Sequence, residues 1–271
     1  MKDYLERDLV GGAVTQPAEV VFVIWGGAND YISKEPFTGD ISTLLDDPDS
    51  QAGYRRIVLE AVASLADQVR VLYAAGGRQF VVLNLPDLGK TPIVMQNQSY
   101  FPSGRKLPDP HRRLQLSAKL SQLTAYHNSR LTRELTALRR ELPDAKIVYV
   151  DSARLVAQIL DGRAPDGSRE RFDYGFSVRE LSSELRDGRT RGSFQNRCYS
   201  GGYLGTLDAA SAICAQSQSA MFWDVVHPTS YTHCWLAYFV QGELASAGLA
   251  PKPGSTAEQR AYCTARNYSA F

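Results

Sequence analysis

Short, nearly continuous apolar runs alternate with stretches of helical periodicity, and this alternation constrains the fold of the chain more than any other feature. Residues 19–25 form one such run, which ends in a Gly-Gly pair, and residues 80–85 form another. A run of this length without polar alternation is typical of a strand buried on both faces, as in a parallel sheet. Between the runs, apolar residues recur at helical spacing: Val58, Val62, Leu65, Val69 and Leu72. The sequence therefore predicts a strand–helix–strand unit with parallel strands.

The same alternation continues towards the C-terminus. A long leucine periodicity predicts a second helix that ends before Pro143: Leu116, Leu120, Leu123, Leu131, Leu135, Leu138 and Leu142. Residues 146–150 predict a third strand, and a last helix is expected from about Ser230 to Ala247, with four residues facing inward: Leu236, Phe239, Val240 and Leu244. These elements predict a single α/β domain over residues 1–271, with helices flanking a parallel sheet.

Residues from about 160 to 222 interrupt this pattern. The segment is rich in Gly, Arg, Ser and Asp, and its periodicity is weak. It is too long for an ordinary connection between elements of a compact domain. We expect a substrate-binding or lid region here, with a plain surface excursion as the alternative.

Charge and apolar content argue against two kinds of partner. The 30 Lys and Arg residues against 29 Asp and Glu leave a net charge of +1, and no basic stretch is interleaved with aromatic residues. Nucleic acid is therefore not an expected partner. No apolar run reaches the roughly 18 residues that a membrane-spanning helix needs. Nothing in the sequence indicates an obligate protein partner.

Four cysteines in the last third of the chain predict two disulfides. They lack the paired C-x-x-C spacing of a zinc site. We favour Cys198 with Cys214 and Cys234 with Cys263, because each pairing closes a short loop worth roughly 3 kcal/mol; four buried free thiols are the alternative. Disulfides indicate an extracytoplasmic protein, yet residues 1–8 contain no apolar segment of a signal peptide. We therefore expect the start of the protein to lie upstream of this chain.

One polar segment directly follows the first predicted strand. Gly27 and Asn29 would lie at the carboxyl ends of parallel strands, where ligand sites form. An Asn amide there can donate a hydrogen bond to a developing oxyanion, and a Gly lets the backbone approach closely. The alternative is a tight turn in which Asn29 and Asp30 bond local backbone groups.

A second polar segment precedes the last predicted helix. Asp224 and His227 lie in one loop, so the carboxylate can hold the Nδ1 proton and leave Nε2 to act as a base. Pro228 restricts the loop behind that base. The alternative is a helix entry in which Thr229 or Ser230 caps the helix and His227 has no catalytic role.

Together with residues 84–92, these two segments resemble blocks of the GDSL lipase/acylhydrolase branch of the SGNH hydrolases. Residues 27–30 match the family's Gly-x-Asn-Asp block, whose Asn helps to form the oxyanion hole. Asp224 and His227 match its Asp-x-x-His block. The three matches follow the family order, and the resemblance extends from near residue 1 to about residue 245.

The resemblance implies the three-layer, flavodoxin-like SGNH fold and a serine ester hydrolase of the lipase, esterase or phospholipase type. It assigns Asp224 and His227 to a Ser-His-Asp mechanism, and Asn29 with Gly27 to the oxyanion hole. The expected substrate is a small-molecule or lipid carboxylic ester, and a lipid would bring the protein against a membrane surface. Neither a metal nor an organic cofactor is expected, because no residue cluster has metal-ligand spacing and no Gly-rich phosphate loop is present.

The cysteine-bearing region before Asp224 resembles the secreted bacterial branch of the family, which contains phospholipases, lipid acyltransferases and hemolysin-like proteins. That branch implies a secreted or periplasmic location. Transfer of an acyl group from a lipid to an alcohol is therefore an alternative to hydrolysis.

The family's nucleophile block, Gly-Asp-Ser after a strand, has no match. No Gly-Asp-Ser or Gly-x-Ser-x-Gly occurs in the chain. Ser152 follows a strand and opens a predicted helix, but an N-cap at Asp151 or Ser152 is the favoured interpretation. We expect the nucleophile and the first two strands of the sheet upstream, since the strand at residues 20–25 would otherwise be an exposed apolar edge. A truncated, non-catalytic protein that binds lipid or glycan is the alternative.

Three further histidines receive other interpretations. His127 falls on the leucine periodicity of its helix, which predicts a position packed at the edge of the core. His111 stands among proline and arginine residues at a helix start and is expected to be solvated. His233 lies one turn beyond Thr229, and we assign it no role.

Overall fold

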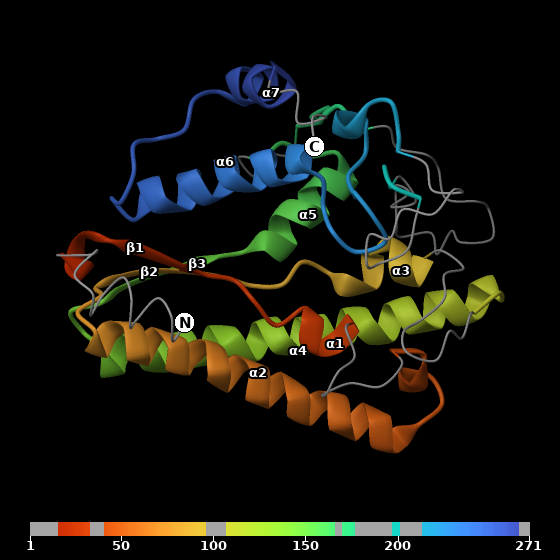
Figure 1. Cartoon of the computed structure of the whole chain (residues 1–271), viewed down its shortest axis with the longest axis horizontal. Helices are drawn as coiled ribbons and strands as arrows, with labels where there is room; N and C mark the ends of the chain where they lie inside the picture. The colour runs from red at the N-terminus through yellow and green to blue at the C-terminus, as the bar shows by residue number, and fades with distance from the viewer. Residues whose placement is uncertain are drawn as a thin grey trace.

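The computed structural model describes residues 16–32, 41–95, 107–165, 170–176, 197–200 and 213–265. Three strands form one sheet: β1 (Val21–Ile24), β2 (Gln79–Leu83) and β3 (Lys146–Val150). Their order is β1-β2-β3 and both pairings are parallel, with Val81 beside Val23 on one side and Val148 on the other. Figure 1 shows the sheet between two layers of helices, which confirms the predicted α/β class and its parallel sheet.

Strand β2 shows why its sequence is continuously apolar. Phe80 and Val82 pack into the core on one face of the sheet, whereas Val81 and Leu83 pack into the core on the other. Alternate side chains of a strand point to opposite faces, so a central strand covered on both sides needs apolar residues throughout. Strand β1 is shorter at both ends than the predicted 19–25. Strand β2 begins one residue before and ends two residues before the predicted 80–85, and β3 has the predicted bounds.

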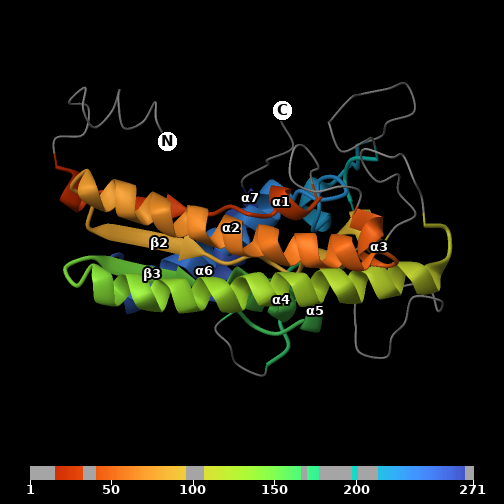
Figure 2. The same cartoon turned by 90° about the horizontal axis from the view of Figure 1, so that it is seen from below.

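One layer consists mainly of two long helices that lie side by side along the sheet and run in the same direction, α2 (Pro48–Ala74) and α4 (Pro110–Glu141) (Figure 2). Each begins with an aspartate cap followed by proline at the first helical position, a favourable arrangement for a helix start. The predicted apolar stripes of both helices are buried. His127 of α4 is buried and His111 is exposed, as predicted.

Strand β2 continues into a turn that packs closely on α4. Asp87 accepts a hydrogen bond from Gly89 N at 2.9 Å and begins a short 3-10 helix, Leu88–Lys90. A Cβ on Gly89 would lie 2.2 Å from the carbonyl oxygen of Ser117, so only glycine allows this approach. The short helix α3 (Pro92–Met95) follows.

The other layer contains α5 (Ser152–Asp161), α6 (Ser230–Ser246) and α7 (Thr256–Ala265). Trp235 is fully buried in α6 and packs among the aromatic rings of Phe172 and Tyr174. The predicted inward residues of α6 all pack against the core, but only Phe239 is buried, whereas Leu236, Val240 and Leu244 are partly buried. Helix α6 is apolar on most sides, so its sequence does not single out the face that meets the sheet.

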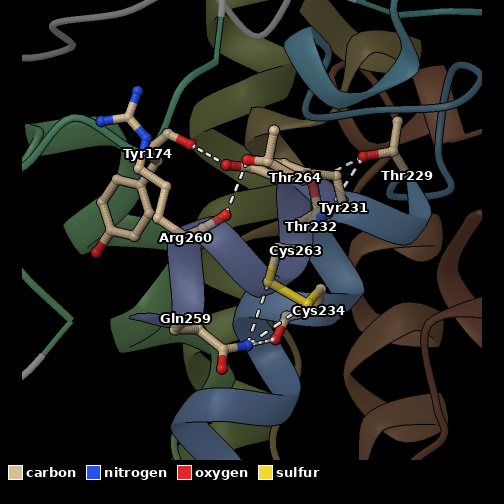
Figure 3. Close-up of a disulfide and its surroundings, with 9 residues drawn as sticks. All are labelled: Tyr174, Thr229, Tyr231, Thr232, Cys234, Gln259, Arg260, Cys263 and Thr264. Carbon is tan, nitrogen blue, oxygen red and sulfur yellow. Dashed lines mark hydrogen bonds between the residues drawn. A yellow bond between two sulfur atoms is a disulfide. The ribbon is translucent and has the colours of Figure 1, made fainter. Parts of the chain in front are cut away.

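Helix α7 was not predicted. Its sequence is largely polar, and Cys263 is its only buried residue. A helix of this composition has no apolar periodicity in its sequence from which it could be predicted. The disulfide between Cys263 and Cys234 ties it to α6, and the amide of Gln259 donates to the Cys234 carbonyl oxygen at 3.1 Å (Figure 3).

Both predicted disulfides are confirmed. Cys198 pairs with Cys214 across a sequence separation of 16, and Cys234 pairs with Cys263 across a separation of 29. Most of the loop-rich region at 160–222 lies outside the described residues, so its expected lid or binding role stays a prediction. Among the helices that the structure describes, none is long and apolar enough to cross a membrane.

Strand β1 borders the described sheet. Val23 is 63% exposed, although it stands beside the fully buried Val81 in the sheet. Within the described residues, β1 pairs only with β2. The expectation of two further strands before it stays a prediction.

Candidate active site

A cavity of about 310 Å³ lies at the carboxyl ends of β1 and β2. Three of the predicted site residues line it: Gly27, Asn29 and His227. The fourth, Asp224, lies behind His227 and is buried. The fold therefore brings together two segments that are far apart in the sequence, at the edge of a parallel sheet where ligand sites form.

Asp224 and His227 make the predicted contact. The Nδ1 atom of His227 lies 2.7 Å from Oδ2 of Asp224. The other carboxylate oxygen accepts hydrogen bonds from the backbone N–H groups of Val226 and His227, each at 2.7 Å. The carboxylate is thus held from both sides, and its bond to Nδ1 turns Nε2 away from it. The His227 side chain is 55% exposed.

The electrostatics of this pair favour a charged imidazolium. Burial raises the pKa of Asp224, but hydrogen bonds from the His227 side chain and from the backbone outweigh burial, so the pKa lies below its usual value. The hydrogen bond to Asp224 raises the pKa of His227 against the opposing effect of burial. A carboxylate that stays ionised and stabilises a protonated imidazole is the arrangement that a histidine general base requires.

Backbone pairing holds the loop that carries this pair. Trp223 N donates to the carbonyl oxygen of His227 at 2.7 Å, which closes the turn. Cys198 N and Tyr199 N donate to the carbonyl oxygens of Phe222 and Trp223, at 2.9 and 2.6 Å. The Cys198–Cys214 disulfide therefore lies directly against the loop.

Helix α6 begins immediately after this loop. The side chain of Thr229 accepts from Thr232 N at 3.2 Å and caps the helix. The helix-entry interpretation is thus correct for Thr229. It does not conflict with the Asp224–His227 contact, because the two features use different residues of the same loop.

The Gly27–Asn29 loop follows β1. Gly27 has φ of +104°, which side chains rarely allow, and a Cβ there would lie 3.0 Å from Cε1 of His127. Asn29 is exposed and begins the one-turn helix α1 (Asn29–Ile32), in which Tyr31 N and Ile32 N donate to the carbonyl oxygen of Ala28. The loop therefore bends sharply and presents Asn29 on the cavity.

Ser152 lies in a different environment from a reactive serine. It is buried, and its hydroxyl donates to the backbone and side-chain oxygens of Asn84. Asp151 caps α5 by accepting from Arg154 N at 3.0 Å, so the N-cap interpretation is confirmed for Asp151. Because its hydroxyl is buried and hydrogen-bonded to Asn84, we assign Ser152 no catalytic role.

The structure adds residues to the cavity that the sequence analysis did not identify. Trp25 and Leu85 end apolar runs and could have been found as strand-end residues, whereas Met221 and Phe222 stand in an irregular loop that has no periodic signal. His233 also lines the cavity, and its ring packs edge-on against Trp25 with centroids 6.2 Å apart. Burial and the charge of His227 lower the pKa of His233. In the part of the chain that the structure describes, no group of three metal-ligating side chains comes together.

Comparison with known protein families identifies the family of this chain. The family described as GDSL-like Lipase/Acylhydrolase matches residues 2–240. The chain belongs to this family. The match confirms the family resemblance found in the sequence and, with it, the SGNH type of fold.

Several relatives come from Arabidopsis thaliana. A GDSL esterase/lipase is 21% identical over 211 residues, which cover 73% of this chain and 47% of that protein. A protein named inactive GDSL esterase/lipase-like protein 25 is 23% identical over 225 residues, which cover 83% of this chain and 44% of that protein. Anther-specific proline-rich protein APG is 28% identical over 213 residues, which cover 77% of this chain and 32% of that protein. The chain spans about half, or less, of the length of these relatives.

These three relatives are plant proteins. They do not test the expectation of a secreted bacterial branch, which stays a prediction.

Proposed function

We propose that this chain provides the acid–base pair and the oxyanion hole of a serine hydrolase that acts on carboxylic esters. The supporting observation is that His227, hydrogen-bonded to Asp224, lines the same cavity as Gly27 and Asn29. The chain contains no Gly-Asp-Ser and no Gly-x-Ser-x-Gly. The proposal therefore includes a serine nucleophile from a segment N-terminal to this chain.

In this mechanism the serine hydroxyl attacks the ester carbonyl, and Nε2 of His227 takes its proton. Asp224 orients the imidazole and stabilises the imidazolium, while the amide of Asn29 donates to the oxyanion of the tetrahedral intermediate. The imidazolium then protonates the leaving alcohol. Water repeats the sequence on the acyl-enzyme and releases a carboxylic acid.

The cavity wall favours an apolar acyl group. Leu85, Met221, Phe222 and Val226 line it together with Trp25. An alkyl chain buried against such a wall is stabilised by about 0.8 kcal/mol per methylene group. We therefore propose esters of aliphatic acids as the substrate class. Lipid esters belong to this class, and a membrane surface would be the place where such a protein meets them.

The two disulfides support a location outside the cytoplasm, either secreted or periplasmic. We propose this location for the protein.

A non-catalytic protein is the second candidate. One relative of comparable identity carries the word inactive in its name. An Asp-His pair without a nucleophile cannot form an acyl-enzyme, but the cavity could still bind a lipid. Transfer of the acyl group to an alcohol would use the same acyl-enzyme as hydrolysis, and it stays a third prediction.

The test uses two proteins: this chain, and the same chain extended by any reading frame that continues upstream of Met1. We expect a fluorophosphonate probe to label a serine only in the extended protein, which should also hydrolyse p-nitrophenyl decanoate. His227→Ala in that protein should lower kcat by about 10⁴ or more. His111→Ala is the matched control, since His111 is exposed at the start of α4 and lies outside the cavity lining.

Each other outcome has a definite meaning. Labelling of a serine within this chain would place the nucleophile here and overturn the upstream proposal. An in-frame stop directly before Met1, or an extended protein that is neither labelled nor active, would leave the non-catalytic candidate. Near-normal kcat in His227→Ala would remove His227 from the mechanism.

A further inference from the structure

One buried histidine has no place in the mechanism above. His127, in the middle of α4, is 0% exposed. Its Nδ1 atom lies 2.8 Å from the hydroxyl oxygen of Tyr31. Its Nε2 atom is buried and has no hydrogen-bond partner in the described structure. Buried polar atoms without a partner are uncommon and costly, so an apolar residue would be the simpler choice for this position.

The contacts of His127 lie on both sides of Asn29 in the sequence. Two residues before Asn29, the imidazole edge occupies the space beside Gly27 where a side chain would begin. Two residues after Asn29, Tyr31 packs edge-on against the imidazole, with ring centroids 5.8 Å apart, and bonds to it. A single side chain from α4 thus contacts both flanks of the candidate oxyanion-hole residue.

Asn29 needs an external support of this kind. It is exposed, and it begins a helix of only four residues. A single helical turn is not stable by itself, because its few hydrogen bonds do not offset the entropy of ordering its backbone. An oxyanion donor nevertheless has to be held to within about 0.5 Å of its working position.

The contact between His127 and Tyr31 joins two neutral groups. Burial lowers the pKa of His127 to about 4. Burial and the neighbouring charge of Asp30 raise the pKa of Tyr31, so its phenol stays protonated. The hydrogen bond therefore persists unchanged over the pH range in which His227 would act as a base.

We propose that His127 and Tyr31 are positioning residues that hold the Gly27–Asn29 loop, and with it the Asn29 amide, in the orientation for an oxyanion hole. The role of Asn29 in that hole rests on the proposed function. The support of the loop by His127 and Tyr31 can be tested separately, because it affects the local stability of the loop whether or not the chain is an enzyme.

The first experiment measures hydrogen exchange at the amides of Tyr31 and Ile32, which donate to the carbonyl oxygen of Ala28. Tyr31→Phe and His127→Phe each remove the hydrogen bond and keep an aromatic ring in place. Each should accelerate exchange at these amides about tenfold, as expected from loss of one buried hydrogen bond. The double variant should show no further increase, because both changes remove the same bond. Tyr126→Phe, which removes a phenol hydroxyl from the residue beside His127 in α4, is the matched control and should leave the rates unchanged.

His127→Asn separates the two contacts. Its side-chain amide can still reach Tyr31, but it lacks the ring edge beside Gly27. Exchange at Tyr31 should therefore stay closer to the native rate than in His127→Phe, whereas exchange at the amides of the Gly27–Asn29 segment should increase. Native rates throughout this segment in both Tyr31→Phe and His127→Phe would overturn the proposal. So would equal acceleration across α6, which would show only a general loss of stability.

The second experiment links the loop to ligand binding with decanoate, a carboxylate that the Asn29 amide could bind. The chain should bind decanoate, and Tyr31→Phe should weaken binding about fivefold while the titration of His227, followed by NMR, stays unchanged. Equal affinity in the wild type and Tyr31→Phe would overturn the link between the loop and the oxyanion hole. If the wild-type chain does not bind decanoate at all, the substrate proposal fails, and the exchange rates still decide whether His127 and Tyr31 hold the loop.

Discussion

The Gly27–Asn29 loop and the Asp224–His227 loop border the same cavity but are held in place by different means. The first is packed against α4 through His127 and Tyr31, without a covalent link. The second is paired with a short segment at Cys198 and Tyr199, which a disulfide joins to Cys214. The first loop adjoins the large core between the sheet and α4, whereas the second follows residues 213–222, which contain only a short 3-10 helix and isolated bridges.

The difference shows how the surroundings of a loop determine the support that it needs. A loop that leaves a strand next to a helix can be held by buried side chains of that helix. A loop outside the regular helices and strands can instead be held by backbone pairing to a crosslinked segment, because the crosslink restricts the unfolded chain. The comparison predicts that substitutions which alter packing against α4 affect the Gly27–Asn29 loop. Replacement of the cysteines should instead affect the Asp224–His227 loop.

The largest effect should come from filling the space beside His127. Gly27→Val would put a branched side chain at a φ of +104° and against a buried imidazole. The strained backbone and the overpacking together should lower the free energy of unfolding by about 4 kcal/mol, measured by urea denaturation. Gly53→Ala is the control: its Cβ meets nothing within 4 Å in helix α2, and it should add about 0.5–1 kcal/mol. A Gly27→Val protein as stable as the wild type would contradict this account of the loop.

An intermediate effect is expected for the disulfide beside the second loop. Replacement of Cys198 and Cys214 by serine should lower the free energy of unfolding by about 3 kcal/mol. Hydrogen exchange at Trp223 should accelerate, because its N–H closes the turn that carries His227. Exchange at Tyr31 should accelerate only through the global loss of stability.

The second disulfide provides the matched control for this experiment. Replacement of Cys234 and Cys263 by serine should lower the free energy of unfolding by a similar amount, since this disulfide also closes a short loop. Its specific effect should appear in α7 and not at Trp223. If both pairs of replacements accelerate exchange at Trp223 equally, the Cys198–Cys214 bridge has no special part in holding the loop.

The smallest of the three effects concerns pH and compares the two histidines. The pKa of His127 falls from 6.5 to about 4 on folding, so the unfolded chain binds more protons between these values. Its contribution to stability is present above pH 6.5 and is lost as the pH falls towards 4, by about 2 kcal/mol between pH 7.5 and pH 5. The raised pKa of His227 acts in the opposite sense: its contribution is present at low pH and is lost as the pH rises through that pKa.

The measurement is the free energy of unfolding at several pH values for the wild type and for His127→Asn. The variant should lose about 2 kcal/mol less than the wild type between pH 7.5 and pH 5. An NMR titration should show His227 titrating at a higher pH than His127, with the pKa of His227 above that of an ordinary histidine and His127 still neutral at pH 5. Parallel pH profiles for the two proteins would contradict the assignment.

Residues that interact within a short segment could be predicted well. Asp224 and His227 lie three positions apart, and their contact needs only the local turn. The apolar run of β2 identified a strand buried on both faces, and the leucine periodicity identified α4. Short loop closures also favoured the two disulfides, and both were confirmed.

Contacts between distant parts of the chain could not be predicted. The sequence placed His127 at the edge of the core but contained no sign that it meets Tyr31 and Gly27. Nothing marked Trp235 as the fully buried residue of α6, or Met221 as part of the cavity wall. Helix α7 was missed because a disulfide, not an apolar stripe, holds it to the fold.

The sequence by itself determined the type of each main element, the parallel α/β class and the residues of the local Asp-His pair, because period and short spacing directly express backbone geometry. The tertiary structure decided which face of α6 meets the sheet, which side chains enclose the cavity, and that one histidine supports both flanks of Asn29. These features depend on the relative position of α4, α6 and the strand ends. That position follows from the packing of the whole core, which no single segment of sequence contains.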